Sequence, residues 1–147
     1  MQLAQTLGAT HEMLKVVIGK DAPLNKMTEV NVAKEGVDAT VFLKVAKKAN
    51  QPISLFAKYM GTTERTLRRH QENGKKLNGT ITQNIIGYAK MHDAGIGYFK
   101  NEERWNLWLD TLNVNFNSQT PRTVIDTQSG RELIGDTLKK LEYGFVA

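Results

Sequence analysis

The sequence feature that most constrains the fold is the stretch ISLFAKYMGTTERTLRRHQE, residues 53–72. Within it, three residues separate Ala57 from Gly61, and five residues separate Gly61 from Leu67. A small residue lets two helices cross closely, and a glycine adopts the left-handed backbone of a tight turn. A leucine on the second helix then faces back into the crossing. This spacing predicts a helix-turn-helix.

Helical periodicity extends over most of the chain from Gly36 onward. Apolar residues recur at helical intervals, and glycine, proline or a polar capping residue separates one run from the next. We expect helices at residues 38–49, 54–60, 64–73, 80–94, 101–109, 120–125 and 129–142. The chain has no cysteine, which excludes a disulfide framework. We therefore predict an all-α fold, with an N-terminal helix-turn-helix module followed by a small helical domain.

The chain divides into an extension of uncertain order, a helix-turn-helix domain and a second domain, at residues 1–35, 36–95 and 96–147. In the extension, Thr10 could cap a helix over residues 11–18, and residues 28–33 alternate weakly like a strand. The segment GIGYFKN, residues 95–101, is expected to be a break between the two domains.

In the second domain, Trp105, Trp108 and Leu109 have helical spacing and are expected in the core. The last helix is expected to bury one apolar side, which consists of Leu133, Ile134, Leu138 and Leu141.

The net charge of +5 is unevenly distributed. Residues 1–100 hold fifteen Lys and Arg against eight Asp and Glu, whereas residues 101–147 hold five against seven. Between residues 44 and 76 alone the balance reaches +7. This density of cations favours a polyphosphate partner, because binding releases condensed counterions. The two parts of the chain are thus expected to have different partners.

With Leu67 facing inward, the arginines at 65, 68 and 69 fall on the outer face of the second helix, where a recognition helix meets the major groove. Arginine makes bidentate contacts with guanine and also binds phosphate. The predicted DNA-binding residues are Lys58, Thr63, Arg65, Arg68, Arg69, Lys75 and Lys76, with the lysines assigned to phosphates. Two alternatives stay open: a helix-turn-helix used only for packing or dimerisation, and a basic face that docks onto an acidic protein.

The sequence contains no recognisable motif of catalytic residues. His11, His70 and His92 share no metal-ligand spacing, and GIGYFKNEERW lacks the preceding strand of a dinucleotide-binding loop. We expect no catalytic residue, metal or cofactor, and we expect His70 to be half-buried and hydrogen-bonded. The N-terminus has no signal-peptide pattern, and no apolar run approaches the roughly 20 residues that span a bilayer. A cytoplasmic protein is the expectation.

Several short motifs follow one another in the second half of the chain: Trp108-Leu109, Thr120-Pro121, Val124-Ile125-Asp126-Thr127, Gly130 and Leu141-Glu142-Tyr143-Gly144. Their order resembles the toxin-binding domain of the Xre/MbcA/ParS antitoxin family. Members of that family carry an N-terminal Xre-like helix-turn-helix, and TERTLRR, residues 63–69, is similar to its recognition helix. The resemblance covers about residues 36–147.

The resemblance implies a type II antitoxin that neutralises a cognate toxin, most often a RES-domain protein that consumes NAD or transfers ADP-ribose. It also implies binding to the operator and repression of the antitoxin's own operon. In the family, the C-terminal region of the antitoxin obstructs the active site of the toxin, and Gly130, Tyr143 and Gly144 match that region. Arg122 stands where an aliphatic residue is usual, which would change the contact surface. A homodimer is expected, since operators usually present two half-sites.

The chain ends in YGFVA, and two interpretations of this tail are open. Phe145 and Val146 could fold back onto Trp105 or Leu141, or they could form an apolar patch for a partner. The position of the tail favours the second interpretation. The predicted toxin-binding residues are Arg122, Gly130, Tyr143, Gly144, Phe145 and Val146. The competing hypothesis is a helix-turn-helix transcriptional repressor without a toxin partner.

Overall fold

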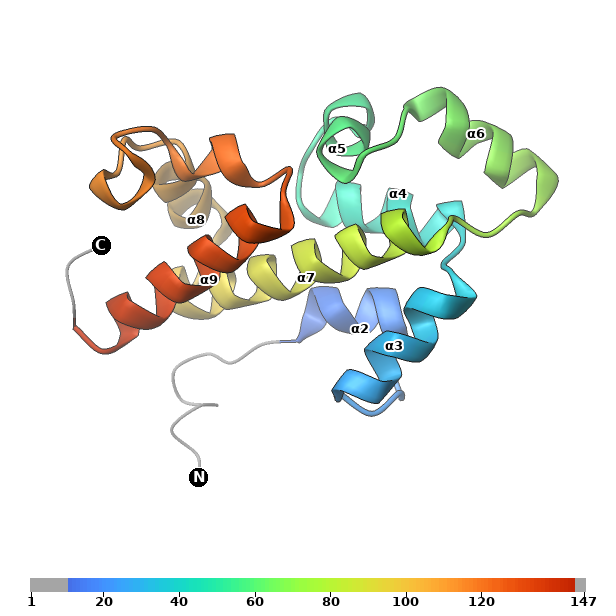
Figure 1. Cartoon of the computed structure of the whole chain (residues 1–147), viewed down its shortest axis with the longest axis horizontal. Helices are drawn as coiled ribbons and strands as arrows, with labels where there is room; N and C mark the ends of the chain where they lie inside the picture. Colours follow the sequence, from blue (N-terminus) through green and yellow to red (C-terminus); the bar gives the residue numbers. More distant parts are fainter. Residues whose placement is uncertain (1–10, 145–147) are drawn as a thin grey trace. The chain divides into compact units, whose positions relative to one another are not determined.

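The computed structural model describes residues 11–144, and their regular structure is helical (Figure 1). Over this range there are α-helices and two short 3-10 helices but no strand, which confirms the predicted all-α fold class. The described residues fall into two compact units. The first comprises residues 12–89, and the second comprises residues 90–144 together with His11.

The first unit contains α2 (Glu12–Ile18), α3 (Lys26–Glu35), α4 (Ala39–Lys48), α5 (Ile53–Met60), α6 (Glu64–Asn73) and the first part of α7 (Gly79–Phe99). Its core is built around three aromatic rings. The ring of Phe56 lies edge-on to Phe42 and to Tyr88, with centroid distances of 5.0 and 4.8 Å. Edge-to-face contact is a preferred geometry for aromatic pairs. These contacts join α4, α5 and α7 beneath the helix-turn-helix.

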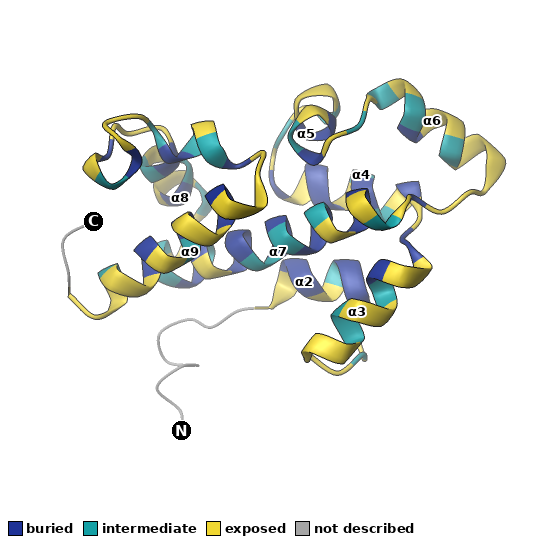
Figure 2. Ribbon diagram, in the orientation of Figure 1, coloured by how far each residue is buried: buried dark blue, intermediate teal, exposed yellow. Residues whose placement is uncertain are grey.

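Residues 12–35 belong to this first unit and do not form a separate extension. The helix α2 packs against α4 and buries Met13, Leu14, Val17 and Ile18 (Figure 2). The expected strand at residues 28–33 is wrong, because α3 covers this range. Asn25 caps α3 by accepting a hydrogen bond from the backbone N–H of Thr28 at 2.9 Å, and this local cap outweighs a weak alternation. Thr10, the expected cap of the preceding helix, lies outside the described residues.

Most helix ends agree with the sequence prediction. The helix α6 covers the predicted residues 64–73 and ends at Gly74, which has a φ of 62°. The helix α5 begins at Ile53, one residue before the predicted start, and Pro52 occupies its N-cap position. Asp38 occupies the N-cap position of α4, but its carboxylate lies 3.7 Å from the Lys76 ammonium and makes no capping hydrogen bond.

The second unit contains the rest of α7, α8 (Glu102–Leu109), the 3-10 helices η1 (Val114–Phe116) and η2 (Pro121–Val124), and α9 (Gln128–Glu142). Trp105 and Leu109 are each 1% exposed, as predicted for the core. Trp108 is only half-buried, and its ring stacks on that of Trp105 with centroids 5.8 Å apart. Of the four residues expected on the buried side of α9, Ile134 and Leu138 are buried, Leu141 is half-buried and Leu133 is 38% exposed. The buried face of α9 is therefore narrower than predicted.

The expected break at residues 95–101 is wrong for most of its length. The helix α7 continues to Phe99, and the chain turns only at Lys100, which has a φ of 72°. Gly95 is a helical residue packed against the indole of Trp105, where an added Cβ would lie 2.5 Å from the ring carbons. This glycine allows close packing and does not mark a loop.

Candidate functional sites: the outer face of α6 and the second helical unit

The predicted turn between α5 and α6 is present. Gly61 has the left-handed backbone angles φ 83° and ψ 29°, and its N–H donates to carbonyl groups of α5. The side chains of Ala57 and Leu67 are 0% and 1% exposed, as the crossing of two helices requires. This agreement places α6 where its outer face is available to a ligand.

Thr63 serves α6 as its N-cap. Its hydroxyl oxygen accepts a hydrogen bond from the backbone N–H of Thr66 at 3.1 Å, and its hydroxyl lies 3.0 Å from that of Thr66. A capping hydroxyl is held at the first turn of the helix. The structure therefore gives this predicted DNA-binding residue a role in the local fold.

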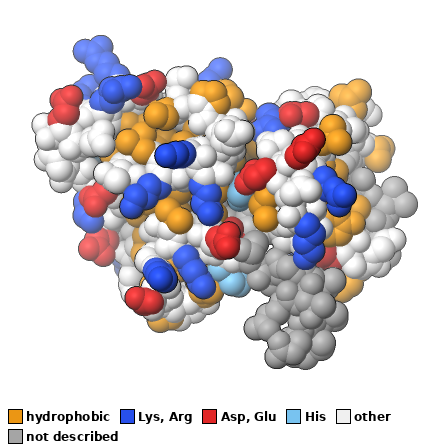
Figure 3. Space-filling view, turned by 180° about the vertical axis from the view of Figure 1, so that it is seen from behind, with side chains coloured by type: hydrophobic (Ala, Val, Ile, Leu, Met, Phe, Trp, Pro, Cys, Tyr) orange, Lys and Arg blue, Asp and Glu red, His pale blue; other side chains and the backbone are white. Residues whose placement is uncertain are grey.

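All six predicted cationic DNA-binding residues are exposed: Lys58, Arg65, Arg68, Arg69, Lys75 and Lys76. In the space-filling view, Lys and Arg side chains spread over the first unit (Figure 3). Arg68 pairs with Glu64 one turn earlier, with Nε donating to a carboxylate oxygen at 3.2 Å. Among the described residues, Arg65 and Arg69 have no acidic side chain within ion-pair distance. These two arginines carry the least compensated charge on the helix.

His70 is half-buried, and its Nδ1 lies 2.8 Å from the backbone carbonyl oxygen of Thr66. This confirms the expected half-buried, hydrogen-bonded histidine, although the partner is a carbonyl of its own helix. Over residues 11–144, no three His, Asp or Glu side chains lie close enough together to hold a metal ion.

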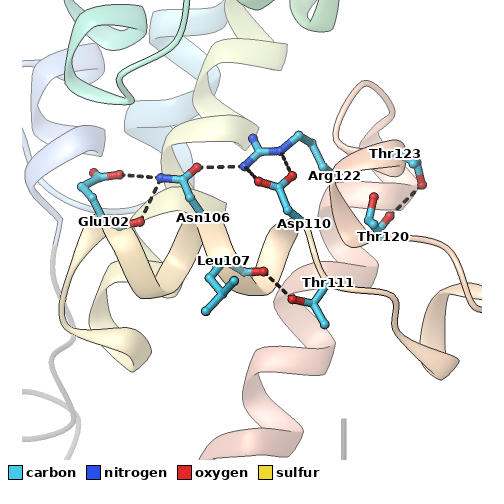
Figure 4. Close-up of polar contacts among 8 residues, drawn as sticks. All are labelled: Glu102, Asn106, Leu107, Asp110, Thr111, Thr120, Arg122 and Thr123. Atoms are coloured by element: carbon cyan, nitrogen blue, oxygen red, sulfur yellow. Dashed lines mark hydrogen bonds and ion pairs between the residues drawn. The ribbon is translucent and has the colours of Figure 1, made fainter.

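In the second unit, Arg122 connects η2 to α8 (Figure 4). Its Nε and one terminal nitrogen donate to the two carboxylate oxygens of Asp110, at 2.6 and 3.2 Å. The same terminal nitrogen donates to the amide oxygen of Asn106 at 2.9 Å. Bidentate pairs of this kind are strong and directional. Arg122, predicted as a toxin contact, therefore has its guanidinium engaged inside its own domain.

Gly130 lies at the junction between η2 and α9. It is buried, and a Cβ at this position would lie 1.8 Å from the carbonyl oxygen of Val124. Its N–H donates at 2.9 Å to the hydroxyl of Thr127, the N-cap of α9. The structure thus assigns Gly130 to close packing of the backbone.

Arg131, which sequence reasoning missed, completes the same junction. It is 6% exposed, and one of its terminal nitrogens donates to the carbonyl oxygen of Ile125 at 2.8 Å. Burial lowers the pKa of the Arg131 guanidinium, while Asp126 and Glu132 act in the opposite direction. The burial of Arg131 could have been predicted, because residues 131, 134 and 138 share one face of a helix.

The other predicted toxin-binding residues lie at the end of the described chain. Tyr143 is 78% exposed, and Gly144 has a φ of 81° just after α9 ends at Glu142. Phe145 and Val146 lie outside the described residues. The structure therefore separates these predicted residues into a packed group, Arg122 and Gly130, and an exposed group, Tyr143 and Gly144.

The comparisons with known proteins bear on the second unit. Residues 94–144 match the family model of the antitoxin Xre/MbcA/ParS C-terminal toxin-binding domain. A search of curated proteins returned no match to the chain. None of the helices in the described range is both long enough and apolar enough to cross a membrane.

Proposed function

We infer that this protein, whose residues 94–144 form an antitoxin Xre/MbcA/ParS C-terminal toxin-binding domain, acts as a type II antitoxin. The second unit binds and neutralises a cognate protein toxin, and the first unit binds the operator of the same operon and represses it. The family match carries the first half of this proposal. The exposed arginines of α6 support the second half.

As the toxin we propose a RES-domain protein that consumes NAD or transfers ADP-ribose, following the family resemblance. Neutralisation would occur by obstruction of the toxin's active site by the C-terminal region, residues 143–147. The exposure of Tyr143 supports this assignment, because a large aromatic side chain left in solvent is suited to burial in an interface. The protein itself has no catalytic role in this proposal and acts in the cytoplasm, beside its operator.

For DNA binding, α6 would enter the major groove, with Arg65 and Arg69 contacting base edges or phosphates. Lys58, Lys75 and Lys76 flank α6 and are suited to phosphates, which set the register of a protein on DNA. The ion pair of Arg68 with Glu64 is exposed and therefore weak, so Arg68 can exchange it for a phosphate. A homodimer would present two copies of α6 to two half-sites.

Growth rescue tests the toxin half of the proposal. Cells that express the toxin encoded beside this gene should stop growing, and co-expression of the full chain should restore growth. The chain without residues 143–147 should restore growth less well while still binding operator DNA. No rescue by the full chain would favour a transcriptional repressor without a toxin partner, and full rescue by the shortened chain would exclude the tail from neutralisation.

A further inference from the structure

The corner between α8 and η1 exposes three large apolar side chains within eight residues. Leu107, Leu112 and Val114 are 68%, 72% and 76% exposed. Leu107 lies on α8 opposite the face that buries Trp105 and Leu109. Single exposed apolar residues are common on protein surfaces, whereas a group of them in one short segment is suited to contact with a partner.

The backbone of this corner is held in place by hydrogen bonds. Asn113 is extended, with φ −140° and ψ 128°, and its N–H donates to the carbonyl oxygen of Gln119 at 2.9 Å. The residue is 9% exposed, and its side-chain amide oxygen accepts from the backbone N–H of Asn115 at 2.9 Å. Neighbours of an extended residue share the opposite face, so Leu112 and Val114 both point outward because Asn113 points inward.

The end of α8 is held as well. The hydroxyl of Thr111 donates to the carbonyl oxygen of Leu107 at 2.6 Å. Arg122 ties Asp110 and Asn106 to η2, on another side of α8 from Leu107 (Figure 4). The apolar side chains are therefore presented on a preformed backbone, which lowers the entropy cost of binding a partner.

The segment that forms this corner also contains little charge. From Trp105 to Pro121 the sequence contains a single ionisable charge, Asp110, and that carboxylate is paired with Arg122. A segment without unpaired cations lacks the counterion release that drives most binding to nucleic acid. Depletion of charge together with exposed apolar side chains is typical of the centre of a protein–protein interface.

We propose that Leu107, Leu112 and Val114, here termed the apolar corner, form a docking surface for the toxin that is separate from the C-terminal tail. The toxin is the occupant because the apolar corner lies within residues 94–144, the part that matches a toxin-binding domain. The inference rests on the proposed function and adds a second contact to it. The corner would bury its leucines in an apolar depression of the toxin, while the tail obstructs the active site.

The test uses the full chain and the purified, catalytically inactive product of the adjacent toxin gene, with binding measured by calorimetry. The variant Leu112→Asp/Val114→Asp should weaken toxin binding at least about tenfold, as truncation of central interface residues does. Met27→Asp is the matched control, because Met27 is 63% exposed but lies on α3 of the first unit. It should bind the toxin like the wild type. Thermal unfolding and operator binding of both variants should be unchanged.

If the double variant binds the toxin with unchanged affinity, the apolar corner is not a docking surface, and the proposed function stays intact. Loss of self-association by the double variant without loss of toxin binding would also overturn this inference, because the corner would then contact a second copy. No binding by the wild-type chain would overturn the proposed function and this inference together. Since a folding defect would also lower affinity, the milder Leu112→Gln variant should show the same direction of change with an unaltered melting temperature.

Discussion

The outer face of α6 and the corner between α8 and η1 are both exposed, yet they differ in almost every physical property. The first carries three arginines within five residues, whereas the second extends over residues 105–121 with one charge that is already paired. Hydrated cations favour phosphates, and uncharged leucines favour another apolar surface. Two surfaces of such different chemistry in a chain of 147 residues are suited to two partners of different kinds.

The largest effect on stability is expected when the fold that carries the second surface is disrupted. Trp105→Ala deletes an indole that is 1% exposed and should lower the free energy of unfolding of the second unit by about 3–5 kcal/mol. Toxin binding should fall with it, while operator binding persists. Chemical denaturation followed by circular dichroism measures the change. An unaltered unfolding curve would contradict the central position of Trp105 in this core.

The second prediction removes the first surface instead. Arg65→Ala/Arg69→Ala should weaken operator binding by about 1–3 kcal/mol for each arginine. It should leave the melting temperature and toxin binding unchanged, because both side chains are exposed. Fluorescence anisotropy at several salt concentrations measures the affinity and its salt dependence. Equal affinity and equal salt slope in variant and wild type would exclude these arginines from the interface.

A smaller effect is expected at the junction of η2 and α9. Gly130→Ala places a Cβ against the carbonyl oxygen of Val124 and should destabilise the second unit by about 1–3 kcal/mol. Gly135→Ala is the control, since a Cβ there meets no atom within 4 Å and α9 should tolerate it. Differential scanning calorimetry of both variants separates the two positions. Equal melting temperatures would contradict the tight packing at Gly130.

The smallest effect is expected for Arg68, which can be compared with the other two arginines of α6. Arg68→Ala removes an exposed ion pair with Glu64 and should change the free energy of unfolding by less than about 1 kcal/mol. Its effect on operator binding should be smaller than that of Arg65→Ala or Arg69→Ala, because Arg68 must first leave Glu64. Competition binding of the three single variants to one operator fragment gives their order. A larger loss for Arg68→Ala would contradict that order.

The sequence was informative where one local rule decided the geometry. The glycine at 61 and the leucine at 67 specified the helix-turn-helix, because left-handed backbone and helical register depend on few residues. The helix predicted at residues 101–109 is also present, and the side chain of Asn101 caps it by accepting from the N–H of Arg104 at 2.7 Å. Such signals depend on neighbours in the chain.

The sequence was less informative where the structure depends on packing between residues that are distant in the chain. The glycines in GIGYFKN predicted a break between domains. In the structure Gly95 lies within a helix and leaves room for the indole of Trp105, ten positions later in the chain. The part played by Arg122 depends on Asp110 and Asn106, on a different helix, and no local pattern indicates that pairing. The exposure of Leu112 and Val114 likewise depends on the contact of Asn113 with Gln119. These features required the folded chain.

The central claim is that the two units bind different partners. The most direct test compares the affinity of the wild-type chain and of the Arg65→Ala/Arg69→Ala variant for the purified toxin. We predict tight binding with the same Kd for both proteins, because in the proposed function the toxin contacts only the second unit. A wild-type chain that does not bind the toxin, or a double variant that stays folded but loses toxin binding along with operator binding, would contradict this account.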